Sequence, residues 1–273
     1  MLVERRRAAR VTSRLRPLLA RLTGPTEVTC ELFDGQHLRV ALPELEAIDL
    51  YRHGLIEPPV TAMLLDRLRP GMAFFDVGAH YGYFTVLASR LVGPTGTVVA
   101  FEPSRSAARL LTQNVNHLDR VVVEHVAVQA ETGTALLSDF GPRHSALNTV
   151  LDGARVPARE RRRLRKNVYE VPAVSLDDYT ATHNLRPAIV KLDAEGAELA
   201  ILTGMRDVLR SASPLVVLET GDYQGMAAPA TSECIDVLET MGYRPFEYDN
   251  GLRPHDRRDS YGYGNLFFSR SIR

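Results

Sequence analysis

The most constraining feature of this sequence is a short, mostly apolar run that ends in a glycine turn and continues as an amphipathic helix. The run is Ala73–Val77, the turn is Gly78–Gly82, and apolar residues then recur at helical spacing from Phe84 to Leu91. Such a run is typical of a strand buried on both faces of a parallel sheet. A helix that begins directly after it turns free N–H groups toward a ligand. The feature therefore predicts an α/β fold with a nucleotide-type cofactor at this turn.

Alternation of strand and helix patterns extends through most of the chain and predicts the architecture. The expected strands are 97–102, 121–128, 188–193 and 214–219, the expected helices are 104–116, 195–210 and 232–241, and a closing antiparallel pair is expected at 242–248 and 263–269. We expect a Rossmann-like class I methyltransferase type of α/β fold, with a mostly parallel seven-stranded sheet and helices on both faces.

The regular pattern has two exceptions, which set the predicted domain boundaries. Residues 1–56 read as an N-terminal helical extension followed by a short β-hairpin, with strands at Val28–Leu32 and His37–Ala41. Residues 57–273 read as the catalytic domain, with a substrate-side insertion at about 131–174 that contains a small strand near Thr134–Ser138. The arginine-rich start favours a solvated or docking helix, with a membrane-surface helix as the alternative. No run reaches the length of about 18 apolar residues that a membrane span needs.

An acidic residue in front of the turn distinguishes between cofactors. Asp76 precedes Gly78 by two residues, and the spacing to Gly82 does not match the dinucleotide fingerprint. A carboxylate would repel a pyrophosphate but suits the zwitterionic tail of S-adenosylmethionine, which favours this cofactor over NAD. Glu102 closes the next strand, where a carboxylate can accept hydrogen bonds from ribose hydroxyls. The alternative for Glu102 is a helix cap or a surface acid.

Several motifs together resemble a known family. Phe75–Thr85, Ala100–Ser104 and Val174–Tyr179 are similar to motifs of the FkbM family of S-adenosylmethionine-dependent methyltransferases. The most diagnostic stretch is Val190–Glu198, which matches the K-x-D-x-E-G-x-E signature of that family. Gly54 with Glu57 resembles a motif before the first strand, and Asn265–Phe268 resembles the terminal strand, so the similarity runs from about residue 54 to residue 268.

The resemblance implies a function and a cofactor site. Members of the family mostly methylate hydroxyl groups of sugars, glycolipids and polyketide-type natural products, which implies an O-methyltransferase with a small hydroxylated acceptor. His80 stands where the family usually has asparagine, so we expect a cofactor contact there, with a catalytic role as the alternative. The residues expected to bind the cofactor are Glu57, Asp76, Gly78, His80, Gly82 and Glu102, with Val126 and Ala127 beside the adenine.

The catalytic candidates lie around the fourth parallel strand. A hydroxyl is a poor nucleophile, so a general base or a metal ion must help to remove its proton. Asp193 ends the strand and is the first choice, while Lys191 points to the same side by strand alternation and could tune Asp193 or orient the substrate. Glu195 opens the following helix as a second candidate. His144, in the insertion, is a plausible base near neutral pH, with an exposed loop histidine as the alternative.

Metal dependence is a minority hypothesis. Asp193 and Glu219 end neighbouring strands and could hold a divalent cation, but the sequence offers no third ligand that we can place. Cys30 and Cys234 are the two cysteines, and their separation supports neither a disulfide framework nor a zinc site.

The overall charge bears on partners. The formal net charge is +0, which argues against a dedicated nucleic-acid binder. Arg159–Lys166 could clamp an anionic acceptor, although a solvated helix face is the commoner meaning of such a run. The composition, rich in arginine, alanine and leucine, suggests a bacterial protein, and the reduced thiols suggest the cytoplasm. The alternatives left open are an RNA or protein methyltransferase and a catalytically silent cofactor-binding scaffold.

Overall fold

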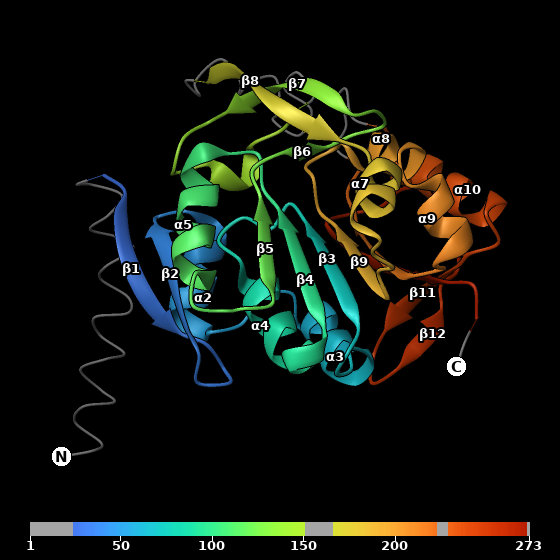
Figure 1. The fold of residues 1–273 in the computed structure, drawn as a ribbon, viewed down its shortest axis with the longest axis horizontal. Helices are drawn as coiled ribbons and strands as arrows, with labels where there is room; N and C mark the ends of the chain where they lie inside the picture. Colours follow the sequence, from blue (N-terminus) through green and yellow to red (C-terminus); the bar gives the residue numbers. More distant parts are fainter. Residues whose placement is uncertain (1–23, 151–165, 223–228, 272–273) are drawn as a thin grey trace.

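An eight-stranded mixed sheet forms the centre of the fold (Figure 1). In the computed structural model, which describes residues 24–150, 166–222 and 229–271, the strand order is β12-β11-β13-β10-β9-β3-β4-β5. The five parallel strands are β5 (Val121–Glu124), β4 (Thr97–Phe101), β3 (Ala73–Val77), β9 (Ile189–Leu192) and β10 (Leu215–Thr220). The antiparallel strands are β13 (Gly264–Ser269), β11 (Arg244–Tyr248) and β12 (Leu252–Pro254). The Rossmann-like class and the closing antiparallel pair are thereby confirmed.

The strand number differs from the expected seven. The extra strand, β12, has three residues and pairs with β11 beyond a turn at Asp249–Gly251. A strand of that length has no hydrophobic period for sequence reasoning to detect. The expected third strand at 121–128 is also divided, because β6 (Ala127–Val128) leaves the main sheet and pairs with the insertion. Only Glu124 and His125 interrupt the apolar residues here, and two polar residues were too weak a signal to reveal the break.

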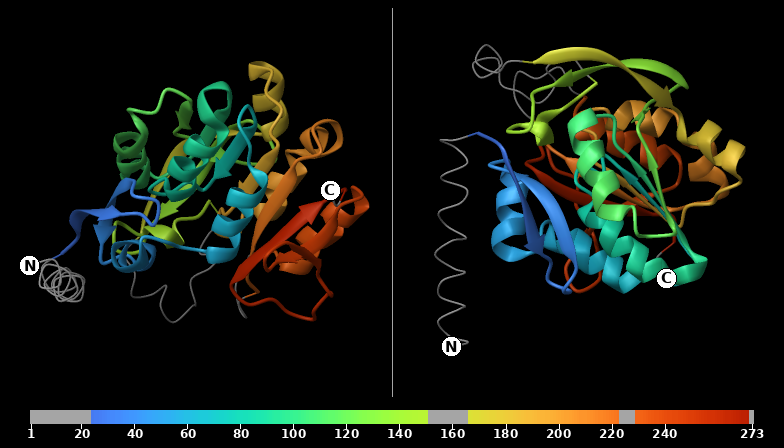
Figure 2. Two further views of the ribbon diagram at one scale, coloured as in Figure 1. Left: turned by 90° about the horizontal axis from the view of Figure 1, so that it is seen from below. Right: turned by 60° about the vertical axis from the view of Figure 1, so that its left-hand side comes forward.

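Helices cover both faces of the main sheet, as expected (Figures 1 and 2). One core contains residues of α2 (Leu45–His53), α3 (Pro58–Arg67), α4 (Tyr83–Val92) and α5 (Arg105–Val115). The other contains residues of α7 (Leu176–His183), α8 (Glu198–Thr203), α9 (Arg206–Ser211) and α10 (Thr231–Thr240). Strand β3 shows the alternation, because Phe74 joins the first core and Phe75 the second.

The single helix expected over 195–210 is two short helices, α8 and α9. The break falls at Gly204, where a Cβ atom would lie 2.3 Å from the carbonyl oxygen of Gln129. Close approach of the chain segment after β6 therefore interrupts a pattern that is helical in sequence.

The N-terminal hairpin is present and packs on the main domain. Strands β1 (Thr26–Glu31) and β2 (His37–Leu42) are antiparallel, and Val28, Leu38 and Val40 belong to the same core as α4 and α5. Asn114 of α5 accepts a hydrogen bond from the Arg39 N–H at 2.8 Å and donates to the Arg39 carbonyl at 2.9 Å. The division of the chain at residue 56 stays a prediction, and the expected N-terminal helix lies outside the described residues.

The insertion forms a second sheet beside the carboxyl ends of the parallel strands. Strands β7 (Gly133–Asp139) and β8 (Asn167–Val174) are antiparallel and make a three-stranded sheet with β6, drawn above the main sheet in Figure 1. A short 3-10 helix, η2 (Ser145–Leu147), follows β7. Nearly all of the arginine run, residues 159–165, lies outside the described residues.

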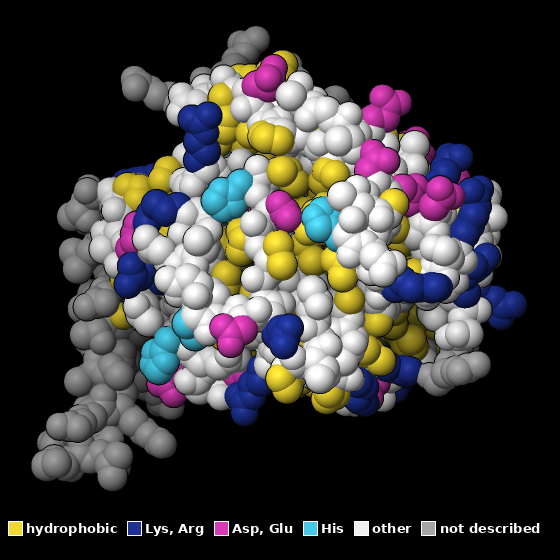
Figure 3. All heavy atoms as spheres, viewed as in Figure 1, with side chains coloured by type: hydrophobic (Ala, Val, Ile, Leu, Met, Phe, Trp, Pro, Cys, Tyr) yellow, Lys and Arg dark blue, Asp and Glu magenta, His cyan; other side chains and the backbone are white. Residues whose placement is uncertain are grey.

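Two further features concern the surface of the molecule and the length of its helices. On the face shown in Figure 3, hydrophobic side chains are exposed toward the middle, and Lys and Arg side chains lie mainly toward the rim. Among the described residues, no helix is long and apolar enough to cross a membrane.

Candidate active site

The loops after β3 and β9 touch each other and form the base of the site. Gly78 has a φ of +79°, and a Cβ atom there would lie 1.7 Å from the carbonyl oxygen of Asp193. No other residue can occupy this position without moving one of the loops. The close approach that this glycine permits is therefore between two segments of the chain, and it brings Asp193 beside the turn.

The second glycine of the turn has a packing role. Gly82 has a φ of +89° and precedes α4, and a Cβ atom there would lie 2.5 Å from Leu111 Cδ1 of α5. Gly82 thus lets α4 begin in contact with α5. It is not among the residues that line the cavities described below.

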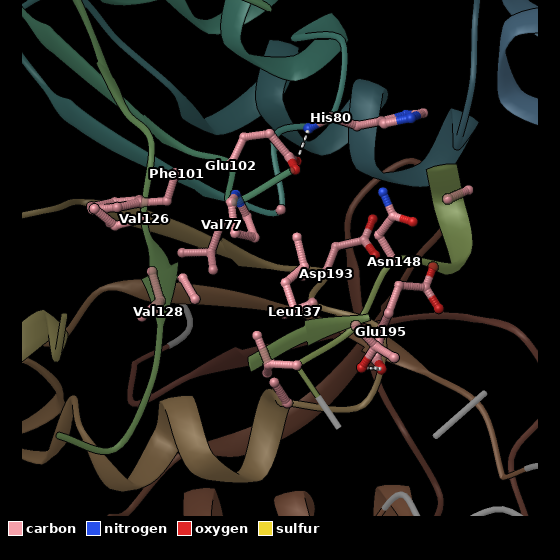
Figure 4. Close-up of a pocket in the computed structure, with 18 of the residues that line it drawn as sticks. Val77, His80, Phe101, Glu102, Val126, Val128, Leu137, Asn148, Asp193 and Glu195 are labelled. Atoms are coloured by element: carbon pink, nitrogen blue, oxygen red, sulfur yellow. Dashed lines mark hydrogen bonds between the residues drawn. The ribbon is translucent and has the colours of Figure 1, made fainter. Parts of the chain in front are cut away.

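A cavity of about 660 Å³, partly open to solvent, lies above these loops. Its apolar wall comes from Val77, Phe101, Val126, Ala127 and Val128, and its polar wall from His80, Glu102, Asp193 and Glu195. Figure 4 shows these side chains converging from β3, β4, the segment after β5 and the loop after β9. Five residues expected at the cofactor thus line one cavity, namely Val126, Ala127, Glu102, His80 and Gly78, and their contact with the cofactor stays a prediction. Such a combination of flat apolar surface and a few polar groups suits a nucleoside.

Glu102 is buried, and two backbone N–H groups bind its carboxylate. Its carboxylate accepts hydrogen bonds from the His80 N–H at 2.9 Å and the Ser104 N–H at 2.8 Å. Burial raises the pKa of Glu102 above its ordinary value, against the lowering effect of His80 and the two N–H donors. The alternative of an exposed surface acid is excluded, because 6% of this residue is exposed.

His80 is the centre of a hydrogen-bonded chain. Its Nδ1 lies 3.0 Å from Glu46 Oε2 of α2, and its Nε2 lies 2.8 Å from the Ser145 hydroxyl of η2. The Ser145 oxygen lies 3.0 Å from the hydroxyl of Tyr81. Burial lowers the pKa of His80, but the bond to Glu46 and the nearby carboxylates outweigh it and raise the pKa to about 9. At neutral pH the ring is a cation and cannot act as a base, so its position favours the structural or cofactor-contact role.

Lys191 is a buried cation surrounded by carboxylates. Its Nζ lies 2.5 Å from Asp193 Oδ2 and 3.6 Å from Glu57 Oε1, and 2% of the side chain is exposed. Burial lowers the pKa of Lys191, yet Asp193, Glu57 and Asp76 together raise it well above its ordinary value. The side chain therefore stays an ammonium that is paired with Asp193, and its expected catalytic role stays a prediction.

A second, smaller cavity of about 300 Å³ lies next to the first. Glu57, Tyr83, Phe84 and Lys191 line it, and Gly78, His80 and Asp193 are shared with the larger cavity. Glu57 accepts a hydrogen bond from Asn265 Nδ2 at 2.6 Å, while its Oε1 is buried without a hydrogen-bond partner in the described part of the chain. Burial raises the pKa of Glu57 to about 7 against the lowering effect of Lys191.

Asp76 lies in β3, one residue before Val77 of the larger cavity. It is fully buried, its Oδ2 accepts a hydrogen bond from Thr85 Oγ1 at 2.6 Å, and its Oδ1 has no hydrogen-bond partner among the residues described. Burial raises the pKa of Asp76, against the lowering effects of Lys191 and Thr85. The structure does not place it among the lining residues of either cavity, so its proposed contact with the cofactor stays a prediction.

Three carboxylates gather at the strand ends. Oxygen atoms of Asp193, Glu195 and Glu219 lie within 4.8 Å of one another, which supplies the third acidic group that the sequence did not reveal. Glu195 reaches this place because its backbone is left-handed, with a φ of +51°. Glu198 turns inward instead and accepts hydrogen bonds from the N–H groups of Ala194 and Gly196. His144 is not among the residues that line either cavity, and its catalytic role stays a prediction.

Comparison with known families shows to which family the chain belongs. The family model described as the methyltransferase FkbM domain matches residues 76–245, which is more than half of the chain. The chain belongs to the FkbM family of methyltransferases. This confirms the resemblance carried by the motifs, and it makes the protein an S-adenosylmethionine-dependent methyltransferase.

The relatives of this FkbM-family enzyme are named for different substrates. The chain is 30% identical to 31-O-demethyl-FK506 methyltransferase FkbM of Streptomyces tacrolimicus over 197 residues, 64% of this chain and 74% of the relative. It is 24% identical to the hexuronic acid methyltransferase AglP of Haloferax volcanii over 209 residues, 75% of this chain and 80% of that protein. The crystal structure of an FkbM methyltransferase from Methylobacillus flagellatus aligns with 17% identity and a TM-score of 0.45, over 80% of this chain and 46% of that one.

Sequence reasoning missed several residues at the site of this FkbM-family enzyme. Glu46 and Ser145 hold His80, and Asn148 lines the larger cavity. Glu46 lies on a helix with no recognisable motif, so no local signal could have identified it. The histidine at position 80, where the family usually has asparagine, was the one signal, because a buried imidazole needs hydrogen-bond partners for both ring nitrogens.

Proposed function

We propose that this enzyme transfers the methyl group of S-adenosylmethionine to a hydroxyl group of a small molecule, such as a sugar, a glycoside or a polyketide-type natural product. The observation that carries the proposal is the cluster of Asp193, Glu195 and Glu219 at the edge of the cofactor cavity. A hydroxyl must lose its proton during the transfer, and a carboxylate can accept it. We also propose that the enzyme acts in bacterial natural-product biosynthesis and is located in the cytoplasm.

The residues at the two cavities fit the cofactor. Val126 and Ala127 offer flat apolar surface for the adenine, and Glu102 offers carboxylate oxygens for the ribose hydroxyls. The buried oxygens Glu57 Oε1 and Asp76 Oδ1 lack hydrogen-bond partners within the described residues. Glu57 lines the smaller cavity, where the ammonium group of a ligand could donate to its carboxylate, 3.6 Å from Lys191 Nζ. Asp76 lines neither cavity, so the assignment rests on Glu57. The larger cavity is thus assigned to the adenosyl part and the smaller to the amino-acid tail.

The bound cofactor supplies an electrophilic methyl group on a sulfonium centre, and the protein supplies orientation and a proton acceptor. Asp193 lines both cavities, so it stands where the tail and adenosyl parts are expected to join. Lys191 fixes its carboxylate through a 2.5 Å contact. Lys191 keeps Asp193 in its charged form, which is the form that can accept a proton. Glu195 and Glu219 repel this charge, so the uptake of a proton by the cluster relieves the repulsion. We therefore assign the base to Asp193, with Glu195 as the next candidate.

A divalent cation is the second way to use the same cluster. Three carboxylates within 4.8 Å could hold a hard cation through oxygen ligands. The Lys191 ammonium already neutralises Asp193, however, and it would repel a metal ion bound to the same carboxylate. The base mechanism is therefore preferred.

The experiment that tests the proposal is methyl transfer to a panel of acceptors. The purified protein is incubated with S-adenosylmethionine and hydroxylated sugars, glycosides and macrolides, and the products are analysed by mass spectrometry and NMR. We expect an O-methyl product with at least one class, and a rate reduced about 100-fold or more in Asp193→Asn. Glu31→Gln, at an exposed position on β1, serves as the matched control. Cofactor binding without turnover on any small acceptor, or transfer to RNA or protein alone, would contradict the proposal.

A further inference from the structure

The segment Ser145–Thr149 spans the larger cavity from one wall to the other. At one end, the Ser145 hydroxyl is hydrogen-bonded to His80 Nε2 at 2.8 Å, in the loop after β3. At the other end, Thr149 Oγ1 donates to the Glu195 carbonyl at 2.8 Å, in the loop after β9. Both loops carry proposed cofactor or catalytic residues. The segment is therefore tied to the two sides of the site, and Ala146 and Asn148 between its ends line the cavity.

Asn148 is the polar residue between these ends, and one half of its amide is fixed. Its Oδ1 accepts a hydrogen bond from the Phe140 N–H at 2.8 Å. Because a backbone N–H can only donate, this contact requires the oxygen there and sets the orientation of the amide. The nitrogen must then point the opposite way.

The nitrogen of Asn148 is a donor without an acceptor. Nδ2 is buried and has no hydrogen-bond partner within the part of the chain that the structure describes. Asn148 lines the larger cavity together with Asp193 and Val128, and Figure 4 draws all three side chains. A buried donor is costly when it is left unpaired, and natural structures rarely keep one without a use. A ligand in the cavity that offers an acceptor atom would satisfy it.

We propose that Asn148 binds the cofactor, with Nδ2 donating a hydrogen bond to an oxygen or a ring nitrogen of the adenosyl part. The inference rests on the proposed assignment of the larger cavity to that part. Glu102, Val126 and Ala127 line the same cavity, whereas Glu57 and Lys191 line the other. A donor fixed on the acceptor hydroxyl would draw electron density from the oxygen that must attack, so the cofactor is the better partner. Asn148 is thus assigned to the cofactor.

Two substitutions at Asn148 separate its donor from its structural contact. Asn148→Asp keeps an oxygen for the Phe140 N–H and removes the donor, while Asn148→Ala removes both groups without adding charge. Asn116→Asp, at the exposed end of α5, is the matched control for the added charge. Thermal unfolding of all variants shows whether each is folded.

The measurement is calorimetric titration with S-adenosylhomocysteine and with 5′-methylthioadenosine, which lacks the amino-acid tail. We expect both Asn148 variants to bind both compounds about tenfold more weakly than the wild type, and Asn116→Asp to bind them normally. Unchanged affinity in Asn148→Ala would overturn the inference, as would a loss confined to S-adenosylhomocysteine. If the wild type binds neither compound, the cofactor assignment of the cavity fails first, and the role of Asn148 fails with it.

Discussion

The Lys191 ammonium lies 2.5 Å from Asp193 Oδ2, and the two residues are two positions apart on and just after one strand. Alternate residues of a strand point to the same side, so the K-x-D spacing of the family signature builds this ion pair locally. Glu57, from the start of α3, adds a second carboxylate 3.6 Å from the same nitrogen. The pair joins the predicted base to the cavity assigned to the cofactor tail.

Replacement of Lys191 by Met should destabilise the enzyme severely. The substitution keeps most of the length of the side chain but leaves Asp193 and Glu57 without a cation between them, which we expect to cost about 3–5 kcal/mol in the free energy of unfolding. Denaturant unfolding measures this loss. Lys166→Met, at the chain's other lysine in an exposed position, is the control and should cost little. Equal stability of the two variants would show that the ion pair does not stabilise the folded enzyme.

His80 should make stability depend on pH in an alkaline window. Its folded pKa of about 9 exceeds the ordinary value of 6.5, so it contributes stability that is fully present below pH 6.5 and is lost as the pH rises through 9. The difference in unfolding free energy between wild type and His80→Asn should shrink by roughly 2–3 kcal/mol from pH 6 to pH 9.5. Urea unfolding across this range tests it, with His37→Asn on the exposed side of β2 as the control. Parallel curves for wild type and His80→Asn would refute the assignment.

A pair of glycine substitutions should reveal the contact between the two active-site loops. Gly78 and Gly35 both have positive φ, but a Cβ atom at Gly78 would lie 1.7 Å from the Asp193 carbonyl, and one at Gly35 would meet nothing within 4 Å. Gly35→Ala should cost about 1–2 kcal/mol for the backbone conformation alone. Gly78→Ala should cost several kcal/mol more, on the order of 3 or above, and should abolish binding of S-adenosylhomocysteine. Similar losses in the two variants would mean that the loops separate easily.

Removal of divalent metal ions should leave methyl transfer intact. The Lys191 ammonium already forms an ion pair with Asp193, so no metal ion is needed to orient the Asp193 carboxylate. We expect protein treated with EDTA and then freed of the chelator to retain most of its rate. A rate that falls at least tenfold and returns with magnesium would instead assign Asp193, Glu195 and Glu219 as metal ligands.

The local pattern of the sequence determined the order and type of most elements. The buried run at Ala73–Val77 and the helix after Gly82 have different hydrophobic periods, which is why they were recognised. Recognition of the family then followed from motifs that are contiguous in the chain, above all Val190–Glu198. An element without a period of its own, such as β12, could not be located in this way, and the two polar residues between the apolar parts of β5 and β6 were too few to show that the strands are separate.

Only the tertiary structure decided how the site is completed. The sequence placed Asp193, Lys191 and Glu102 at strand ends, because strand ends follow from local periodicity. It could not place Glu46 against His80, 34 positions away, or the Asn148 donor in the cavity. Such partners come from a helix and an insertion whose packing depends on long-range contacts, and no local period or spacing encodes those contacts. The sequence by itself thus determined the fold and the likeness to the family, and the packing decided which charges, donors and acceptors meet.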